Sequence, residues 1–153
     1  MSVKRVISQL LLPLLLFGGI CGCDSVSPVE TDTQGTPPLV SDLRLRPDSI
    51  HVDELPPDRV QDSVAQLDLA VQAEVEDPDG TVERVVFTIE PASDPRSTAT
   101  GRLEPVADSI YGRAFLFGVP TSRDELYTIR VFAVDNDSLA SNQAIGQIQF
   151  VSD

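Results

Sequence analysis

The chain has 153 residues, of which 24 are acidic and 11 are Lys or Arg, and its formal net charge at pH 7 is −13. This length is typical of one domain with short additional segments. Such an acidic surface repels the phosphates of nucleic acids and anionic lipids, so we expect no nucleic-acid partner. The charge is compatible with binding of cations or of a basic partner, and solubility alone is a sufficient reason for it.

The first 22 residues are typical of an export signal. Lys4 and Arg5 precede an apolar stretch over residues 10–17, which is followed by glycines and cysteines. This stretch is too short for a transmembrane helix. We therefore expect residues 1–22 to be removed from the mature protein.

The end of this signal is similar to a known processing site. Ile20-Cys21-Gly22-Cys23 resembles the lipobox of bacterial lipoproteins, in which an aliphatic residue and two small residues precede the acylated cysteine. The resemblance implies cleavage before Cys23 and a lipid on its thiol, whereas acylation of Cys21 matches less well. It also implies a membrane partner: the protein is anchored in the cell membrane or outer membrane and faces the periplasm or the cell surface. The alternative is an ordinary secretory signal with two incidental cysteines.

A polar segment follows the cysteine. After Cys23, the rest of residues 23–38 consists of Ser, Thr, Pro, Gly, Gln and acidic residues, with only two isolated valines. This composition is too polar to bury a core and predicts a flexible, disordered tether stiffened by its prolines. We expect the folded domain to comprise residues 39–153.

The domain begins with short extended segments. Residues 40–45 predict a first strand that ends before Pro47, and residues 49–52 predict a second short one. Prolines at 56 and 57 mark a loop, and their positions favour an edge of the sheet.

The clearest pattern covers residues 65–91. On each side of an acidic turn, apolar residues recur at every second position and would form one buried face, which predicts two strands. The turn, Asp77-Pro78-Asp79-Gly80, has the residues that a type I turn prefers. It connects either a plain hairpin or two strands in different layers.

Further strands follow a polar loop over residues 92–101. The pattern predicts a weak edge strand over residues 102–106 and a strand over residues 110–119, with three aromatic side chains inward. A long alternating ladder begins at Tyr127, and a last strand covers residues 144–151 with Ile148 and Phe150 inward. The inward aromatic residues of the 110–119 strand are Tyr111, Phe115 and Phe117.

These strands favour an all-β sandwich, because turn signals recur about every ten residues and no helical period is found. The turn with its flanking strands, the Tyr127-x-Ile129-x-Val131-x-Ala133-x-Asp135 ladder and Ser141-Asn142 resemble bacterial immunoglobulin-like domains. The resemblance implies an immunoglobulin-like β-sandwich of about seven antiparallel strands. It also implies that Tyr127 forms a tyrosine corner, with its ring in the core and its hydroxyl bonded to nearby backbone.

Two acidic loops lie at the same end of such a sandwich. Calcium takes six to eight oxygen ligands and would offset the repulsion between their carboxylates. The alternative is that Asp and Asn are there as turn formers. The candidate calcium ligands are Glu76, Asp77, Asp79, Asp135, Asn136 and Asp137, and the residues expected to have structural roles are Pro78, Gly80 and Tyr127.

The sequence gives little support for catalysis. His51 is the one histidine, and no catalytic motif accompanies it. We therefore expect no enzyme activity and no resident cofactor, with calcium as the alternative. The expected function is a structural or protein-binding module of an envelope lipoprotein, with a protein partner in the envelope. A calcium-dependent adhesion or carbohydrate-binding module is the second hypothesis, and a small envelope hydrolase is the third.

Overall fold

The computed structural model describes residues 35–152, so the predicted signal over residues 1–22 and the lipid site at Cys23 lie outside the described residues. The compact unit that holds the described chain is Thr33–Asp153. No helix in this described part is both long enough and apolar enough to cross a membrane. The described elements are β1 (Leu39–Arg46), β2 (Ser49–His51), the 3-10 helices Val52–Glu54 and Pro57–Arg59, β3 (Val60–Gln61), β4 (Val64–Glu76), β5 (Val82–Pro91), β6 (Ala99–Ala107), β7 (Ile110–Pro120), β8 (Glu125–Asp135) and β9 (Ala144–Val151).

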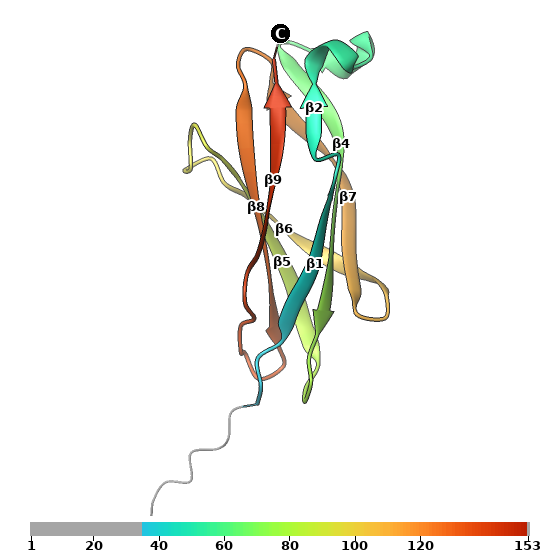
Figure 1. Cartoon of the computed structure of the whole chain (residues 1–153), viewed down its shortest axis with the longest axis vertical. Coiled ribbons are helices and arrows are strands. Elements are labelled where there is room, and N and C mark those ends of the chain that lie inside the picture. Colours follow the sequence, from blue (N-terminus) through green and yellow to red (C-terminus); the bar gives the residue numbers. More distant parts are fainter. Residues whose placement is uncertain (1–34, 153) are drawn as a thin grey trace, which may run out of the picture. The chain divides into compact units, whose positions relative to one another are not determined.

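The nine strands of the described residues form one continuous path, β1-β4-β7-β6-β5-β8-β9-β2, with β3 paired to β4. The path curls into two layers around one core. β1, β3, β4 and β7 form the first layer, and β5, β8, β9 and β2 form the second (Figure 1). This all-β arrangement has the strand order of an immunoglobulin-like sandwich. The described residues form nine strands and not the expected seven or so. Two of the nine, β2 and β3, are only three and two residues long.

The turn after β4 crosses from one layer to the other. β4 pairs with β1 and β7, whereas β5 pairs with β6 and β8, so the two strands that flank the turn do not pair with each other. The hairpin interpretation of residues 65–91 is therefore wrong. The alternation was compatible with both arrangements, because each strand has one face on the shared core.

The core is formed by the inward residues of the strands. In β4, six alternate residues from Ala65 to Val75 are buried, and in β8 Tyr127, Ile129, Val131 and Ala133 are buried. The predicted inward positions of β5 and β9 are also buried, which confirms the period-two prediction. The three aromatic residues of β7 are only half-buried, although they pack against the core.

β6 differs from its prediction in both length and place. It begins at Ala99, inside the segment that the sequence predicts to be a loop. Each half of it pairs on one side only, residues 99–103 with β5 and Glu104, Pro105 and Ala107 with β7, so it lies at an edge of both layers. β6 therefore passes from one layer to the other, and Gly101 and Pro105 lie within the strand.

Residues just before β1 also contact the domain. Pro38 is buried, and the backbone N–H of Thr36 donates to both carboxylate oxygens of Asp79, at 2.8 and 3.1 Å. These two contacts lie just before residue 39, at which the sequence predicts the domain to begin. The polar composition of this segment does not predict the contact between Thr36 and Asp79, because Asp79 is 43 residues away in the chain.

Candidate functional site

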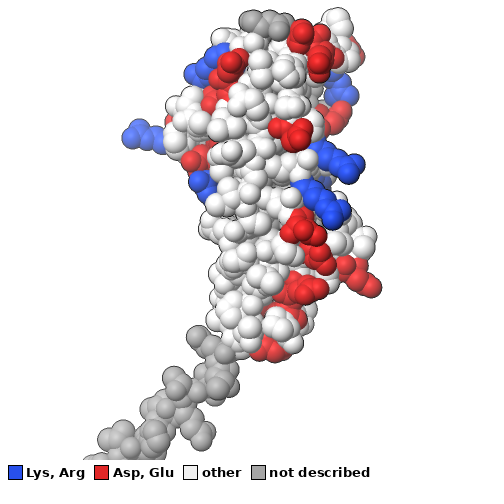
Figure 2. Space-filling model, in the orientation of Figure 1, with Lys and Arg blue, Asp and Glu red and all other residues white. Residues whose placement is uncertain are grey.

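The two acidic loops lie against each other at one end of the sandwich, which we call the acidic pole (residues 76–81 and 135–139). The N–H of Thr81 donates to Asn136 Oδ1 at 2.8 Å, and the N–H of Asn136 donates to the carbonyl of Thr81 at 3.0 Å. The structure thus brings the six candidate calcium ligands to one end. On the face shown in Figure 2, the lower end of the domain carries acidic side chains but no basic ones.

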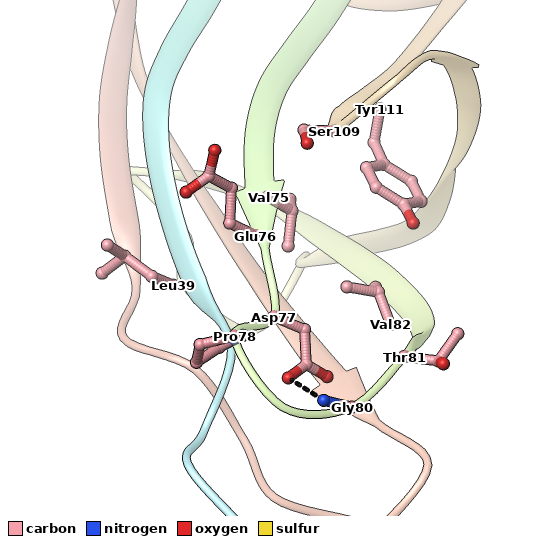
Figure 3. A pocket seen from close by; sticks show the side chains of 10 residues that line it. All are labelled: Leu39, Val75, Glu76, Asp77, Pro78, Gly80, Thr81, Val82, Ser109 and Tyr111. Atoms are coloured by element: carbon pink, nitrogen blue, oxygen red, sulfur yellow. Dashed lines mark hydrogen bonds between the residues drawn. The ribbon is translucent and has the colours of Figure 1, made fainter.

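Asp77 holds the first loop together. Its Oδ1 accepts a hydrogen bond from the N–H of Gly80 at 2.9 Å, which is drawn in Figure 3. The same oxygen accepts from the N–H of Asp79 at 3.3 Å. A Cβ at Gly80 would lie 2.8 Å from Asp77 Oδ2 and 2.9 Å from Asn136 Oδ1, so the close approach of the loops requires glycine here. Pro78 is exposed at the corner of the loop.

Asp135 holds the second loop together through hydrogen bonds to its backbone. Its side chain is buried, with only 2% of the residue exposed, and its Oδ1 accepts from the N–H groups of Asp137 and Leu139, both at 2.8 Å. These bonds support a tight turn in which Ser138 has a φ of 66°. Asx turns of this kind are the reason that Asp is favoured in turns.

The remaining acidic residues point in different directions. Asp79 binds the N–H of Thr36, and Glu76 is exposed and turned away from the Asp77 carboxylate (Figure 3). A Cβ at Gly35 would lie 3.4 Å from Asp79 Oδ1 and 3.6 Å from Asp137 Oδ2, so these two carboxylates lie close to the backbone at Gly35.

The acidic pole is therefore largely a set of hydrogen-bonded turns. Within residues 35–152, no group of three or more His, Cys, Asp or Glu side chains is placed to hold a metal ion. One oxygen is unused: Asp77 Oδ2 is buried and has no hydrogen-bond partner. A hollow of about 530 Å³ adjoins it, lined by Leu39, Val75, Glu76, Asp77, Pro78, Gly80, Thr81, Val82, Ser109 and Tyr111 (Figure 3).

A second polar cluster, absent from the sequence predictions, is centred on Glu125 at the start of β8. Glu125 is only 5% exposed. Its Oε1 accepts from the N–H of Ser93 at 2.9 Å, and its Oε2 accepts from the Ser93 hydroxyl and lies 3.3 Å from Arg123 Nε. Arg123 Nη2 also donates to Ser93 Oγ at 2.8 Å. The cluster fixes the loop after β5 to the start of β8.

These contacts determine the ionisation of Glu125. Burial raises the pKa of the carboxyl, but the hydrogen bonds from Ser93 and the charge of Arg123 outweigh it, so the pKa lies below its ordinary value. The sequence held one signal for this residue: Glu125 has the same parity as Tyr127 and Ile129, which places a charged group on the buried face.

Tyr127 has its ring in the core, as the resemblance implies. It is 5% exposed and meets Phe117 edge-on, with ring centroids 5.1 Å apart. However, its hydroxyl forms no hydrogen bond to backbone in the part of the chain that the structure describes. Burial, with the nearby Glu125 charge, raises the pKa of the phenol.

His51 is exposed on the short strand β2. It borders a hollow of about 410 Å³ that also contains Glu54, Arg59 and Asp68. Arg59 Nη2 donates to Asp68 Oδ2 at 3.0 Å, so the arginine of this hollow is already paired. No hydrogen bond of the described residues orients the His51 ring, and the geometry around it does not resemble a catalytic dyad or triad.

No family model and no curated protein matches the chain. Among solved structures, it is similar to the CARDB domain of the PF1109 protein from Pyrococcus furiosus in complex with di-metal ions. The identity is 12% and the TM-score is 0.36, over 80% of this chain and 100% of that one. It is also similar to a variant of the superoxide reductase (neelaredoxin) from Ignicoccus hospitalis, with 11% identity and a TM-score of 0.35 over 77% of this chain and 82% of that one.

Proposed function

We propose that the chain is an envelope lipoprotein, anchored through lipid on Cys23, whose sandwich is a non-catalytic structural or protein-binding module. The anchor is supported by the Ile20-Cys21-Gly22-Cys23 sequence and by the polar segment that separates it from the domain. Acyl chains contribute about 0.8 kcal/mol for each buried methylene, so two or more chains give a stable anchor.

The non-catalytic part of the proposal is supported by how the polar side chains are used. Asp135 and Glu125 are buried and Asp77 has a buried carboxylate oxygen, and each of the three side chains accepts hydrogen bonds from the backbone of a loop. A general acid or a nucleophile must be free to reach a substrate. Side chains that hold loops together instead make the loops and strand edges rigid, which favours recognition of a partner.

Mass spectrometry of the mature N-terminus tests the proposed lipid anchor. We expect a terminal Cys23 with diacylglycerol on its thiol, and we expect Cys23→Ser to move the protein out of the membrane fraction. Cys21→Ser is the matched control and should leave the protein acylated. Cleavage elsewhere, or an unmodified Cys23, would contradict the anchor. Crosslinking in the intact envelope then tests for a protein partner.

The second candidate is a calcium-dependent adhesion or carbohydrate-binding module that uses the acidic pole. One observation favours it: the buried Asp77 Oδ2 has no partner, and a cation would satisfy it. The test is thermal unfolding of the metal-stripped protein with increasing calcium. Calcium at a hundred times the dissociation constant of the site would stabilise the folded protein by about 2.7 kcal/mol. Asp77→Asn should abolish this shift and Asp68→Asn should not, whereas an unchanged melting temperature in the native protein would leave Asp77 as a turn former only.

A further inference from the structure

One edge of β7 is without a strand partner over most of its length. β7 pairs with β4 from Ile110 to Pro120, but on its other edge only Ile110, Tyr111 and Gly112 pair with β6. Among the described residues, no strand pairs with this edge over residues 113–120. The cause is the passage of β6 between layers: its first half follows β5 and diverges from β7, as Figure 1 shows.

The space left by this divergence is an apolar groove. Two adjoining hollows of about 260 and 250 Å³ lie along it and share Ile89, Ala99 and Phe117. Phe87 and Phe115 stack at its floor with ring centroids 5.3 Å apart. Unpaired backbone beside pockets that accept alternate side chains is the arrangement that binds an extended peptide as an added strand.

This edge also lacks the features that normally prevent strand pairing. Between Arg113 and Pro120, residues 114–119 have no charge, no proline and no bulge, and Leu116 is 61% exposed. The outer edge of β1 differs, because it has a bulge between Ser41 and Arg44 and an exposed ion pair between Asp42 and Arg44. Natural sheets protect edges with such bulges and charges, so an apolar edge without them indicates a partner.

The charge around the groove indicates what kind of partner. Residues 35–152 contain 20 acidic residues and nine arginines, yet residues 96–123 contain four of these arginines and only two acidic residues. Arg113 lines the hollow of about 260 Å³, and Arg123 lines the hollow of about 250 Å³. The acidic groups of the hollow of about 250 Å³ are already bonded, Asp94 to Ser97 and Glu125 to Ser93 and Arg123, so Arg113 is the arginine of the groove without an acidic partner among the described residues. The four arginines are Arg96, Arg102, Arg113 and Arg123.

We propose that the β7 edge over residues 113–120 binds an extended acidic segment of a partner protein as an additional strand. Main-chain hydrogen bonds hold the segment, and its alternate apolar side chains enter the groove. Its carboxylates meet Arg113, which forms no ion pair with an acidic side chain among the described residues. The inference rests on the proposed protein-binding function and assigns it a site and a partner chemistry.

The test measures binding of fluorescein-labelled peptides of about eight residues to the full chain in mild detergent. One peptide alternates Glu with Val, a second alternates Lys with Val, and a third is the Glu peptide with alternate backbone nitrogens methylated. We expect the Glu peptide to bind, and the Lys peptide and the methylated peptide to bind at least tenfold more weakly. Amide exchange of residues 113–120 should slow in the complex.

Variants locate the site. Arg113→Glu and Leu116→Glu should each weaken the Glu peptide at least tenfold, and Arg113→Glu should improve binding of the Lys peptide. Arg44→Glu makes the same charge change on the exposed edge of β1 and should have no effect. Circular dichroism melts show that each variant is folded.

Several results would overturn the inference. No binding of the Glu peptide at millimolar concentration would do so, as would equal binding of both charge types. If the protein dimerises and Leu116→Glu abolishes the dimer, the β7 edge is an interface between two copies of the chain. If deletion of residues 24–34 makes amide exchange of residues 113–120 faster, the chain's own N-terminal segment occupies this edge. Envelope crosslinks that persist in Leu116→Glu, with no peptide binding, would overturn this site and leave the proposed function standing.

Discussion

The side chain of Asn142 pairs with the backbone of Val40, 102 residues earlier in the chain. Asn142 Oδ1 accepts from the N–H of Val40 at 2.8 Å, and Asn142 Nδ2 donates to the Val40 carbonyl at 2.9 Å. The amide thus takes the place of a strand neighbour at the start of β1. Next to it, Ser141 Oγ accepts from the N–H of Ala133 at 2.8 Å, so the β8–β9 connection binds strands of both layers.

We expect Asn142→Ala to destabilise the domain by about 1–2 kcal/mol, because two hydrogen bonds are lost and the Val40 backbone must find water instead. Denaturant unfolding measures the change. Gln143→Ala is the matched control, since Gln143 is exposed and forms no hydrogen bond among the described residues, and its effect should be within about 0.5 kcal/mol. Equal effects of the two substitutions would show that the pairing contributes nothing.

The same region shows what the sequence could and could not predict. Alternation identified the buried faces of β4 and β8, because a period of two follows directly from the pleat. The roles of Asn142, Asp79 and Glu125 were not predictable in this way, because each depends on a partner at least 32 residues away. The passage of β6 between layers was missed for a related reason: one strand with two successive partners has the same alternation as a strand with one.

Gly101 is the second position at which substitution gives a clear expectation. A Cβ there would overlap the ring atoms Cζ and Cε1 of Phe87, a buried core residue. We expect Gly101→Ala to destabilise by about 1–3 kcal/mol, because the ring must leave its position. Gly112→Ala is the control, since its nearest atom would be 3.5 Å away.

A double substitution tests the cause of that loss. Phe87→Leu removes the part of the ring that a Cβ would meet, so Gly101→Ala should destabilise less in this background than in the native chain. Such coupling between touching residues is typically about 0.5–3 kcal/mol. Strict additivity, measured by thermal unfolding of all four proteins, would mean that backbone strain and not the ring opposes a side chain at 101.

Ile129 tests the core itself. Its side chain is fully buried in β8 between the two layers. Ile129→Ala should destabilise by about 2–5 kcal/mol through lost burial and the cavity that remains. Ile145→Ala, at a residue of β9 that is 60% exposed, should change stability by less than about 0.5 kcal/mol. Similar losses at both positions would contradict the placement of the core.

Glu125 makes the stability of the domain depend on pH. Its pKa in the folded protein is below the ordinary value of 4.5, because the contacts with Ser93 and Arg123 outweigh the effect of burial. The folded state therefore binds this proton less readily than the unfolded chain does. The resulting stabilisation is fully present above pH 4.5 and is lost as the pH falls through the folded-state pKa.

We therefore expect Glu125→Gln to be most destabilising near neutral pH, by about 1–3 kcal/mol, since the bonds from Ser93 and Arg123 lose their charged acceptor. The difference from the native protein should shrink as the pH falls below 4.5. Denaturant unfolding between pH 3 and 7 measures it, with Glu104→Gln on the exposed face of β6 as the control. A difference that stays constant over this range would show that the substitution acts through packing, and that the carboxylate charge does not hold the loop after β5.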